Sequence, residues 1–304
     1  MHRCQRCAAR TDSPLRPQRH GRGVSRYRPR HSKRRGDRVN SLSAQRIGAL
    51  ALRYLYLLRR SWIRIVELAY WPTVQMILWG FITRYLSGHS DVLGQAAGLL
   101  LSGVLLWDIL FRSQLGVSVV FFEELHARNL AQLFVSPLRP IELILALMSI
   151  SLIRTLVGVG VAVALALPFY GFNLFALGPP LAGFFLNLLL MGWAIGLLVA
   201  ALVLRHGMGA ESIAWAAIFA LAPLCGIYYP IATLPGWLQP LAWILPASHV
   251  FEGMRAVLLD HTFRLDYFLY ALLLNTGYLG LAISVFLAAV RHAREHGSLL
   301  QSGE

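Results

Sequence analysis

One short pattern in the chain has the residue types of a catalytic pair. His261 and Asp266 lie in the segment HTFRLD, at a His and Asp spacing that is used for acyl transfer. The match is only two residues long and follows the end of an expected helix, so chance explains it better than catalysis. Cys4 and Cys7 form a CxxC without a second pair, which makes a metal or redox site improbable. We therefore expect no catalytic residue and no metal site, with a polytopic membrane enzyme as a minor alternative.

The sequence also lacks the residues of a nucleotide-hydrolysing site. A P-loop needs a lysine that reaches the phosphates, and Lys33, the only lysine of the chain, follows no GxxxxGK segment. If ATP drives this protein, a separate subunit must bind the nucleotide. We accordingly expect no cofactor in this chain, and ATP with Mg²⁺ in a partner subunit.

Three charged residues lie within long apolar runs, where burial is costly unless the charges pair or face a cavity. Asp108 and Arg112 are four residues apart, with the acid nearer the amino end, a spacing that permits pairing on one helix. Counted at about 1.5 Å per residue from the polar segment between the runs, Arg154 reaches a depth similar to that of Asp108. We predict that Asp108, Arg112 and Arg154 form an intramembrane cluster that joins two spans, and we favour a structural role over direct contact with a substrate.

The elements that carry these residues are expected to cross a membrane. The chain has 304 residues, of which 57% are hydrophobic and 14% charged, and its mean hydropathy of +0.57 is too high for a soluble globular protein. The sequence predicts an all-α polytopic membrane protein with six transmembrane helices. They are expected at about residues 66–86, 95–120, 142–168, 179–204, 211–229 and 267–290.

The positive charge is concentrated before the first span. Residues 1–64 contain 18 Lys and Arg against two Asp, whereas the remainder contains 10 basic and 12 acidic residues. A basic segment beside a membrane domain is more simply explained by the positive-inside rule than by nucleic-acid binding. With an even number of spans, both termini and the loop at 121–144 are then expected in the cytoplasm, and nucleic acid is not an expected partner.

Residues 1–64 divide into two expected parts. Residues 1–40 are rich in Arg, Pro, Ser and His, which predicts a disordered basic arm, and we hypothesise that it results from an upstream start assignment. Residues 41–64 are expected to form an amphipathic helix in the cytoplasmic interface, with arginines directed at the phosphates of the lipid bilayer. The arginines that fall within about 40° of one another on this helix are Arg46, Arg53, Arg60 and Arg64.

Two segments resemble a known family. The segment FFEELHARNLAQLFVSPLRP, from residue 121, contains a pair of glutamates, then Arg-Asn-Leu and Ser-Pro-Leu. It resembles the cytoplasmic coupling loop of the membrane subunit of type-2 ATP-binding-cassette (ABC) exporters. The segment GIYYPIATLPGWLQPLAWILPASHVFEGMRAVL, residues 226–258, resembles the carboxy-terminal region of the same family. The resemblance covers about residues 41–295, and it departs from many members at Asn129-Leu130, where they have Gly-Thr.

The resemblance implies a permease subunit without its own ATPase site. Two copies of the chain would form the transmembrane pathway, and two copies of a separate ATPase subunit would dock below it in the bacterial inner membrane. The transmembrane domain would span 65–295, followed by a tail at 296–304, and the exported cargo would be an amphiphile, a drug or a lipid-linked saccharide. The coupling loop, 121–141, would contact the ATPase through Glu123, Glu124, His126, Arg128 and Asn129, and Pro137 would stiffen its exit.

The segment 230–258 contains too many prolines for one spanning helix. The resemblance and the Pro-Gly turn at 235–236 favour an outer re-entrant hairpin of two short helices between the fifth and sixth spans. Glu252 and Arg255, three residues apart, are expected to pair there. The residues singled out in this segment are Pro230, Pro235, Trp237, Pro246, Glu252 and Arg255.

A secondary transporter driven by an ion gradient is the main alternative within membrane proteins. Such a protein should show inverted repeats or buried carboxylates that couple ions to substrate. We find no convincing repeat, and Asp108 is the only acid expected deep in a span. These observations favour the ABC permease without excluding the alternative.

Overall fold

The computed structural model describes residues 43–295, apart from 89–90, 128, 137 and 171–177. Within these residues the regular elements are all helical, and the described helices belong to one compact unit, Leu42–Glu304. The expected basic arm, residues 1–40, and the tail, 296–304, lie outside the described residues. The all-helical fold class predicted from the sequence is confirmed for the described part of the chain.

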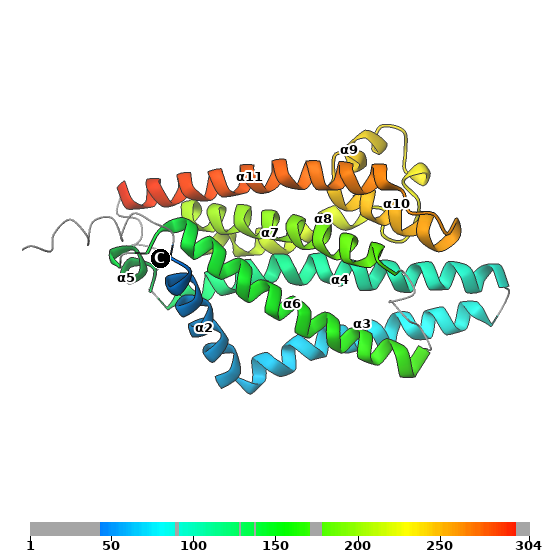
Figure 1. The fold of residues 1–304 in the computed structure, drawn as a ribbon, viewed down its shortest axis with the longest axis horizontal. Coiled ribbons are helices and arrows are strands. Elements are labelled where there is room, and N and C mark those ends of the chain that lie inside the picture. The colour runs from blue at the N-terminus through cyan, green and yellow to red at the C-terminus, as the bar shows by residue number, and fades with distance from the viewer. Residues whose placement is uncertain (1–42, 89–90, 128, 137, 171–177, 296–304) are drawn as a thin grey trace, which may run out of the picture. The chain divides into compact units, whose positions relative to one another are not determined.

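Five helices contain apolar stretches long enough to cross a bilayer. They are α3 (Trp62–Ser87), α4 (Asp91–His126), α6 (Pro140–Tyr170), α7 (Pro180–His206) and α11 (Leu265–Glu295). The shortest of these helices has 26 residues, which at about 1.5 Å per residue gives about 39 Å, more than the hydrocarbon thickness of about 30 Å. Figure 1 shows α4, α7 and α11 running side by side, with α3 and α6 on the other side of α4.

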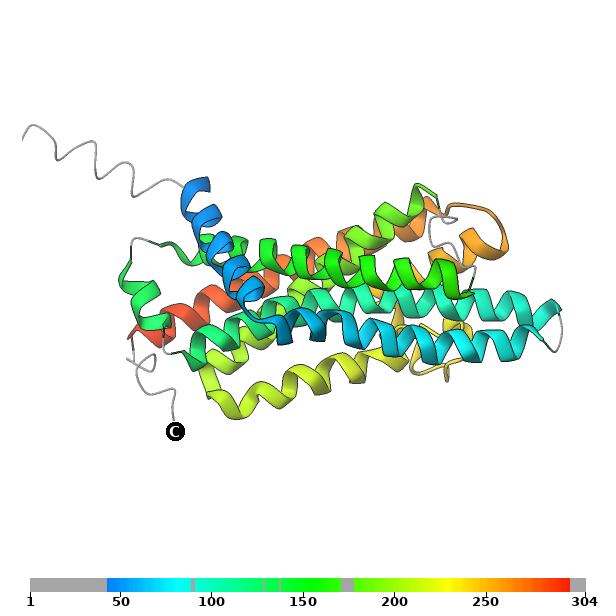
Figure 2. The ribbon, with the colours of Figure 1, turned by 90° about the horizontal axis from the view of Figure 1, so that it is seen from below.

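The expected fifth span is shorter than predicted. Its helix, α8 (Glu211–Leu224), has 14 residues and ends at Leu224 rather than at 229, with Pro223 in the last turn. A helix of this length rises about 21 Å, which is too short to cross a bilayer alone. Figure 2 shows α8 as an outer helix along one edge of the bundle. The count of six spans therefore stays a prediction, since the described helices include five candidates.

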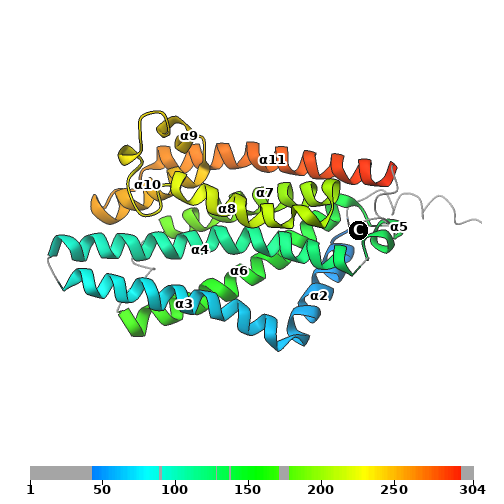
Figure 3. The ribbon, with the colours of Figure 1, turned by 180° about the vertical axis from the view of Figure 1, so that it is seen from behind.

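The short elements gather at the two ends of the bundle (Figures 1 and 3). At one end, called here the α5 end, lie α2 (Ala44–Arg60), α5 (Leu130–Val135) and η2 (Met208–Ala210). At the other, the α10 end, lie η3 (Ile231–Thr233), α9 (Gln239–Trp243) and α10 (Pro246–Leu259). The expected interface helix at 41–64 is divided, because Ser61 is extended and ends α2, so that Arg64 belongs to α3.

The centre of the bundle is held by close contacts between α4, α6 and α7. Gly192 and Gly196 are four residues apart on α7, and a Cβ on Gly192 would overlap the hydroxyl of Ser113 on α4. Small residues at this spacing let membrane helices approach closely. The Ser151 hydroxyl of α6 donates to the Ser113 carbonyl at 2.8 Å and accepts from Trp193 Nε1 at 3.1 Å. Packing and hydrogen bonds thus join the three helices at one level.

Two apolar clusters extend from this centre toward the two ends. The cluster toward the α5 end includes Phe121 of α4 and Phe286 of α11, whose rings meet edge to face at 5.6 Å. The cluster toward the α10 end includes Phe251 and Met254 of α10. In contrast, α3 has few buried side chains and exposes an apolar row that includes Val74, Ile77, Leu78 and Phe81. Such a surface requires lipid or another protein against it.

Candidate coupling and charge-cluster sites

The predicted coupling loop is more helical than expected. The span that was expected to end near 120 continues as α4 to His126, so Glu123 and Glu124 occupy a helix end rather than a loop. Asn129 precedes the short helix α5, which corresponds to the helix expected in this loop. Of the other residues named for ATPase contact, His126 is exposed, and Arg128 and Pro137 lie outside the described residues.

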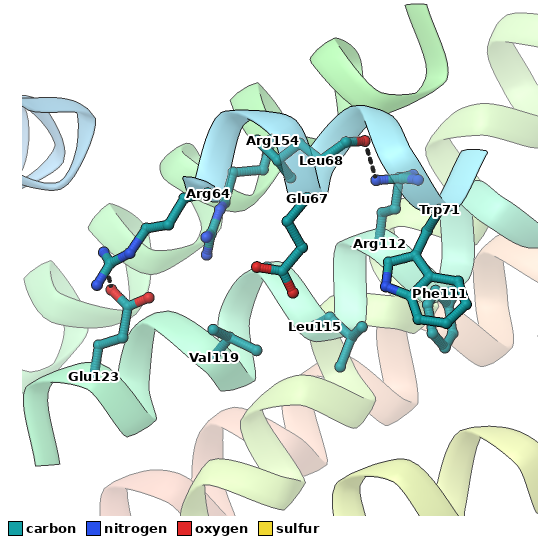
Figure 4. Close-up of a pocket in the computed structure, with 11 residues that line it drawn as sticks. Arg64, Glu67, Leu68, Trp71, Phe111, Arg112, Leu115, Val119, Glu123 and Arg154 are labelled. Atoms are coloured by element: carbon teal, nitrogen blue, oxygen red, sulfur yellow. Dashed lines mark hydrogen bonds and ion pairs between the residues drawn. The ribbon is translucent and has the colours of Figure 1, made fainter. Parts of the chain in front are cut away.

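The two glutamates of this helix end are engaged within the chain. Glu124 is 3% exposed and pairs with Arg53 of α2 at 2.9 Å. Glu123 pairs with Arg64 of α3 at 2.9 Å (Figure 4). Burial, followed by the nearby charge of Glu124, raises the pKa of the Tyr54 hydroxyl on α2 well above its usual value. Glu124 therefore ties α2 to α4 and offers little surface for contact with a partner.

Glu142 is a central residue that the sequence interpretation missed. Its carboxylate is fully buried and accepts hydrogen bonds from the backbone N–H groups of Ser43, at 2.9 Å, and Arg139, at 3.0 Å. The Arg46 guanidinium pairs with it at 2.6 Å. Glu142 is the third residue of α6 and reaches back to the residue before Pro140, which is one half of a capping box. Pro at the first helical position with Glu two residues later was the local signal that could have indicated this role.

The arginines of the expected interface helix have different partners from those predicted. Three of the four pair with acids of α4 and α6, whereas they were expected to face lipid phosphates. Of the four, Arg60 is the exposed one. The helical period grouped Arg46 and Arg53 on one face of α2, but it carried no information on which element that face meets. Arg64 lies on α3, so the period does not relate it to the other two.

The predicted ion pair between Asp108 and Arg112 forms on α4. Arg112 Nε lies 2.5 Å from Asp108 Oδ2, and both side chains are largely buried. Arg112 also donates to the Leu68 carbonyl of α3 at 3.0 Å. A Cβ on Gly158 of α6 would lie 2.6 Å from Arg112 Nη1, so the guanidinium packs directly on that helix. Arg112 therefore joins α4 to both α3 and α6.

Arg154 lines a pocket of about 140 Å³ between α3, α4 and α6, and Arg112, Arg64, Glu67 and Glu123 line the same pocket (Figure 4). Among the described residues, no ion pair or hydrogen bond joins Arg154 to Asp108 or Arg112. The Arg154 Nε atom has no hydrogen-bond partner among the described residues. The prediction rested on equal depth along two helices, but the rotation of each helix also decides contact. Arg112 is held by Asp108 and the Leu68 carbonyl, whereas Arg154 enters the shared pocket from α6.

At the α10 end, the predicted pair of Glu252 and Arg255 forms at 3.1 Å. The Arg255 guanidinium also donates to the carbonyls of Gly226 and Tyr229, the latter at 2.8 Å. Glu252 accepts a hydrogen bond from the Ile231 N–H at 2.7 Å. These contacts supply partners to the irregular backbone that follows α8, where Gly226 has a φ of +65°. Irregular backbone within a membrane protein needs such partners when water is excluded.

The remaining residues of the expected hairpin lie in a segment whose helical structure is interrupted more often than predicted. Pro230 precedes η3, Pro235 begins the turn before α9, and Pro246 opens α10 and is buried. Trp237 is 72% exposed. The two expected helices correspond to α9 and α10, with η3 as an additional turn. Re-entry of this segment into the membrane stays a prediction.

The residues of the minor enzyme alternative do not form a pair. Asp266 binds the exposed Arg264 at 2.8 Å and 3.0 Å, and His261 is exposed in the loop before α11. In the described part of the chain, no group of three or more His, Cys, Asp or Glu side chains is placed to hold a metal ion. The described residues therefore do not support the minor enzyme alternative.

Comparison with known proteins identifies the class of the chain. No curated protein matches it. A family model described as ABC-2 type transporter matches residues 53–259, more than half of the chain, from within α2 to the end of α10. This range contains the α5 segment and the α10 segment whose motifs suggested the same family. The chain belongs to the ABC-2 type transporter family and is a multi-pass membrane protein of the permease type.

Proposed function

We propose that two copies of this chain form the transmembrane pathway of an exporter in the bacterial inner membrane, with both termini cytoplasmic. A separate ATP-binding-cassette subunit would bind ATP and Mg²⁺ and drive the export of an amphiphile, a drug or a lipid-linked saccharide. The family membership supports the transport role. The absence of a P-loop lysine supports a separate ATPase. The observation that carries the coupling part of the proposal is the position of α5 between two spanning helices at the α5 end.

The contacts around α5 are suited to transmit motion. Glu124 fixes the end of α4 to α2, and Glu142 fixes the start of α6 to the same helix. A displacement of α5 would therefore move α2, α4 and α6 together as a rigid body rather than bend a free loop. In this proposal Glu124 and Glu142 hold the coupling segment in position. The exposed side chains of His126 and Gln132 supply contact to the ATPase.

A test of coupling changes the exposed face of α5 without touching these ion pairs. Gln132→Trp places a bulky side chain on α5, and Gln45→Trp makes the same change at an exposed position on α2. We expect Gln132→Trp to reduce several-fold the amount of ATPase subunit that copurifies with the chain, and Gln45→Trp to leave it unchanged. The partner for this experiment is an ATP-binding-cassette subunit that is coexpressed with this chain.

Two results would overturn the proposal. One is full copurification and full transport by the double variant Gln132→Trp, His126→Ala. The other is transport by the purified chain that follows an imposed ion gradient and needs no ATP hydrolysis, which would favour the secondary transporter.

A further inference from the structure

An apolar groove that the sequence did not indicate lies between α7, α8 and α11. Its volume is about 1030 Å³, within the order of magnitude of sites that enclose organic ligands. Aliphatic side chains line most of its length, among them Leu198, Leu202, Ala217, Ala220, Leu224 and Val285. Polar side chains line it at one end, namely Arg205 and His206 in the last turn of α7 and His292 in the last turn of α11. The groove is therefore amphiphilic along its length.

The groove has the depth of one leaflet of a bilayer. On α7 its lining runs from Ile195 to His206, or about 16 Å at 1.5 Å per residue. On α8 it runs from Ile213 to Leu224, about 16 Å. The hydrocarbon core of a bilayer is about 30 Å thick, so one leaflet contributes about 15 Å. The basic end of the groove would then lie at the headgroup level on the α5 side.

The basic end is built to receive an anion. Arg205 is exposed at the last turn of α7. His206 donates from Nδ1 to the Leu202 carbonyl at 3.2 Å, which leaves its Nε2 atom for another partner. His292 approaches from α11. The guanidinium of Arg205 supplies the positive charge and the N–H donors that match the acceptor oxygens of a phosphate group, with the two imidazoles lining the same groove.

We propose that this groove binds a membrane lipid with an anionic phosphate headgroup, taken from the leaflet at the α5 end. The acyl chains occupy the aliphatic length of the groove, and the phosphate lies on Arg205, His206 and His292. The lipid fills the space beside α8, whose inner face is anchored by Ile218 and by contacts of Trp215 and Phe219 with Phe111. This inference does not depend on transport or on an ATPase partner.

The test measures lipid retention by the purified full-length chain. The chain is incubated with equal amounts of phosphatidylglycerol and phosphatidylcholine of the same chain length, and bound lipid is counted by native mass spectrometry. We expect preferential retention of phosphatidylglycerol. Arg205→Gln should reduce this preference about fivefold, the effect of one basic residue near an anionic headgroup. Arg291→Gln, an exposed arginine of α11 outside the groove lining, is the matched control and should retain the preference.

A second pair of variants tests the apolar part of the site. Ala220→Trp fills the groove and should lower the retention of both lipids several-fold. Ala216→Trp makes the same change one turn earlier on α8, outside the groove lining, and should not. Equal retention of the two lipids by the unmodified chain, or retention that neither Arg205→Gln nor Ala220→Trp alters, would overturn the proposal. Rapid disulfide formation between two copies of an Ala288→Cys variant that lacks Cys4 and Cys7 would also overturn it, because a second copy would then occupy the groove.

Discussion

The two ends of the bundle use arginine and glutamate in different ways. At the α5 end, three pairs join residues that are 59 to 96 positions apart in the chain. At the α10 end, the pair of Glu252 and Arg255 is local, three positions apart, and most of its other bonds go to backbone groups. Charges at the first end connect separate helices, whereas charges at the second complete an irregular backbone. The first arrangement suits an end that transmits movement, and the second suits an end that keeps its shape.

The largest effect is expected from breaking the contact at the start of α6. Glu142→Ala removes a fully buried carboxylate that three donors share, so the Arg46 guanidinium and the N–H groups of Ser43 and Arg139 lose this acceptor. We expect a loss of about 3 kcal/mol of stability, on the order of 10 °C in the melting temperature of the purified chain in detergent. Glu295→Ala removes an exposed acid from the last turn of α11 and serves as the control. Unchanged melting of Glu142→Ala would show that the long-range pairs do not hold this end together.

A smaller and more local effect is expected at the α10 end. Arg255→Met keeps the length of the side chain but leaves the carbonyls of Gly226 and Tyr229 without their donor, at a cost of about 2 kcal/mol. The loosened backbone should expose Cys225, which is buried beside it, to a maleimide reagent in a background without Cys4 and Cys7. Arg264→Met, at an exposed pair, should leave the labelling rate unchanged. Equal labelling in both variants would contradict a role of Arg255 in holding this backbone.

The pair of Arg64 and Glu123 should contribute least of the three long-range pairs. Its side chains are 36% and 31% exposed, so water screens the attraction, and we expect about 0.5 kcal/mol from a double-mutant cycle of Arg64→Gln and Glu123→Gln. The coupling energy should fall further when salt is raised. A coupling energy as large as the effect of Glu142→Ala would contradict the prediction that the more exposed pair contributes less to stability.

The smallest effect is expected from His249 of α10, and it depends on pH. Burial lowers the pKa of His249 below its usual value near 6.5, and the hydrogen bond to the Trp243 carbonyl and the charge of Asp266 oppose this only in part. The folded chain thus favours the neutral ring of His249. The stability that this residue contributes is therefore present above about pH 6.5 and is lost as the pH falls below it. Melting temperatures at about pH 7.5 and about pH 5.5 should differ less in His249→Gln than in the unmodified chain. An equal difference in both would refute the assignment.

The sequence predicted contacts within one helix better than contacts between helices. The Asp108 and Arg112 pair and the Glu252 and Arg255 pair follow from spacing alone, because a helix fixes the relative position of residues three or four apart. The pair of Arg46 and Glu142 joins residues 96 positions apart, and no local pattern relates them. Arg154 lines the same pocket as Arg112, but its bonding to the pair could not be predicted, since depth along a helix leaves the rotation of that helix unknown.

The extent of individual elements was predicted with mixed success. The apolar runs indicated the spanning helices because hydrophobic length is itself the physical requirement for crossing a bilayer. The end of α4 was placed too early because Glu123 and Glu124 looked like loop residues, whereas their arginine partners allow them to remain helical. The groove beside α8 had no signal in the sequence, because its lining combines the successive helices α7 and α8 with the more distant α11, and no local pattern relates their faces.

The close contact of Gly192 with Ser113 has a consequence for alternating access. Helices that interlock at this distance cannot slide past one another without a clash, so α4, α6 and α7 form a fixed frame. Any displacement that reaches α4 or α6 therefore has to carry α7 with it. In the proposed exporter, a stroke that moves α5 would shift these three helices as one body, and the pathway would change at the boundaries between that body and the helices around it.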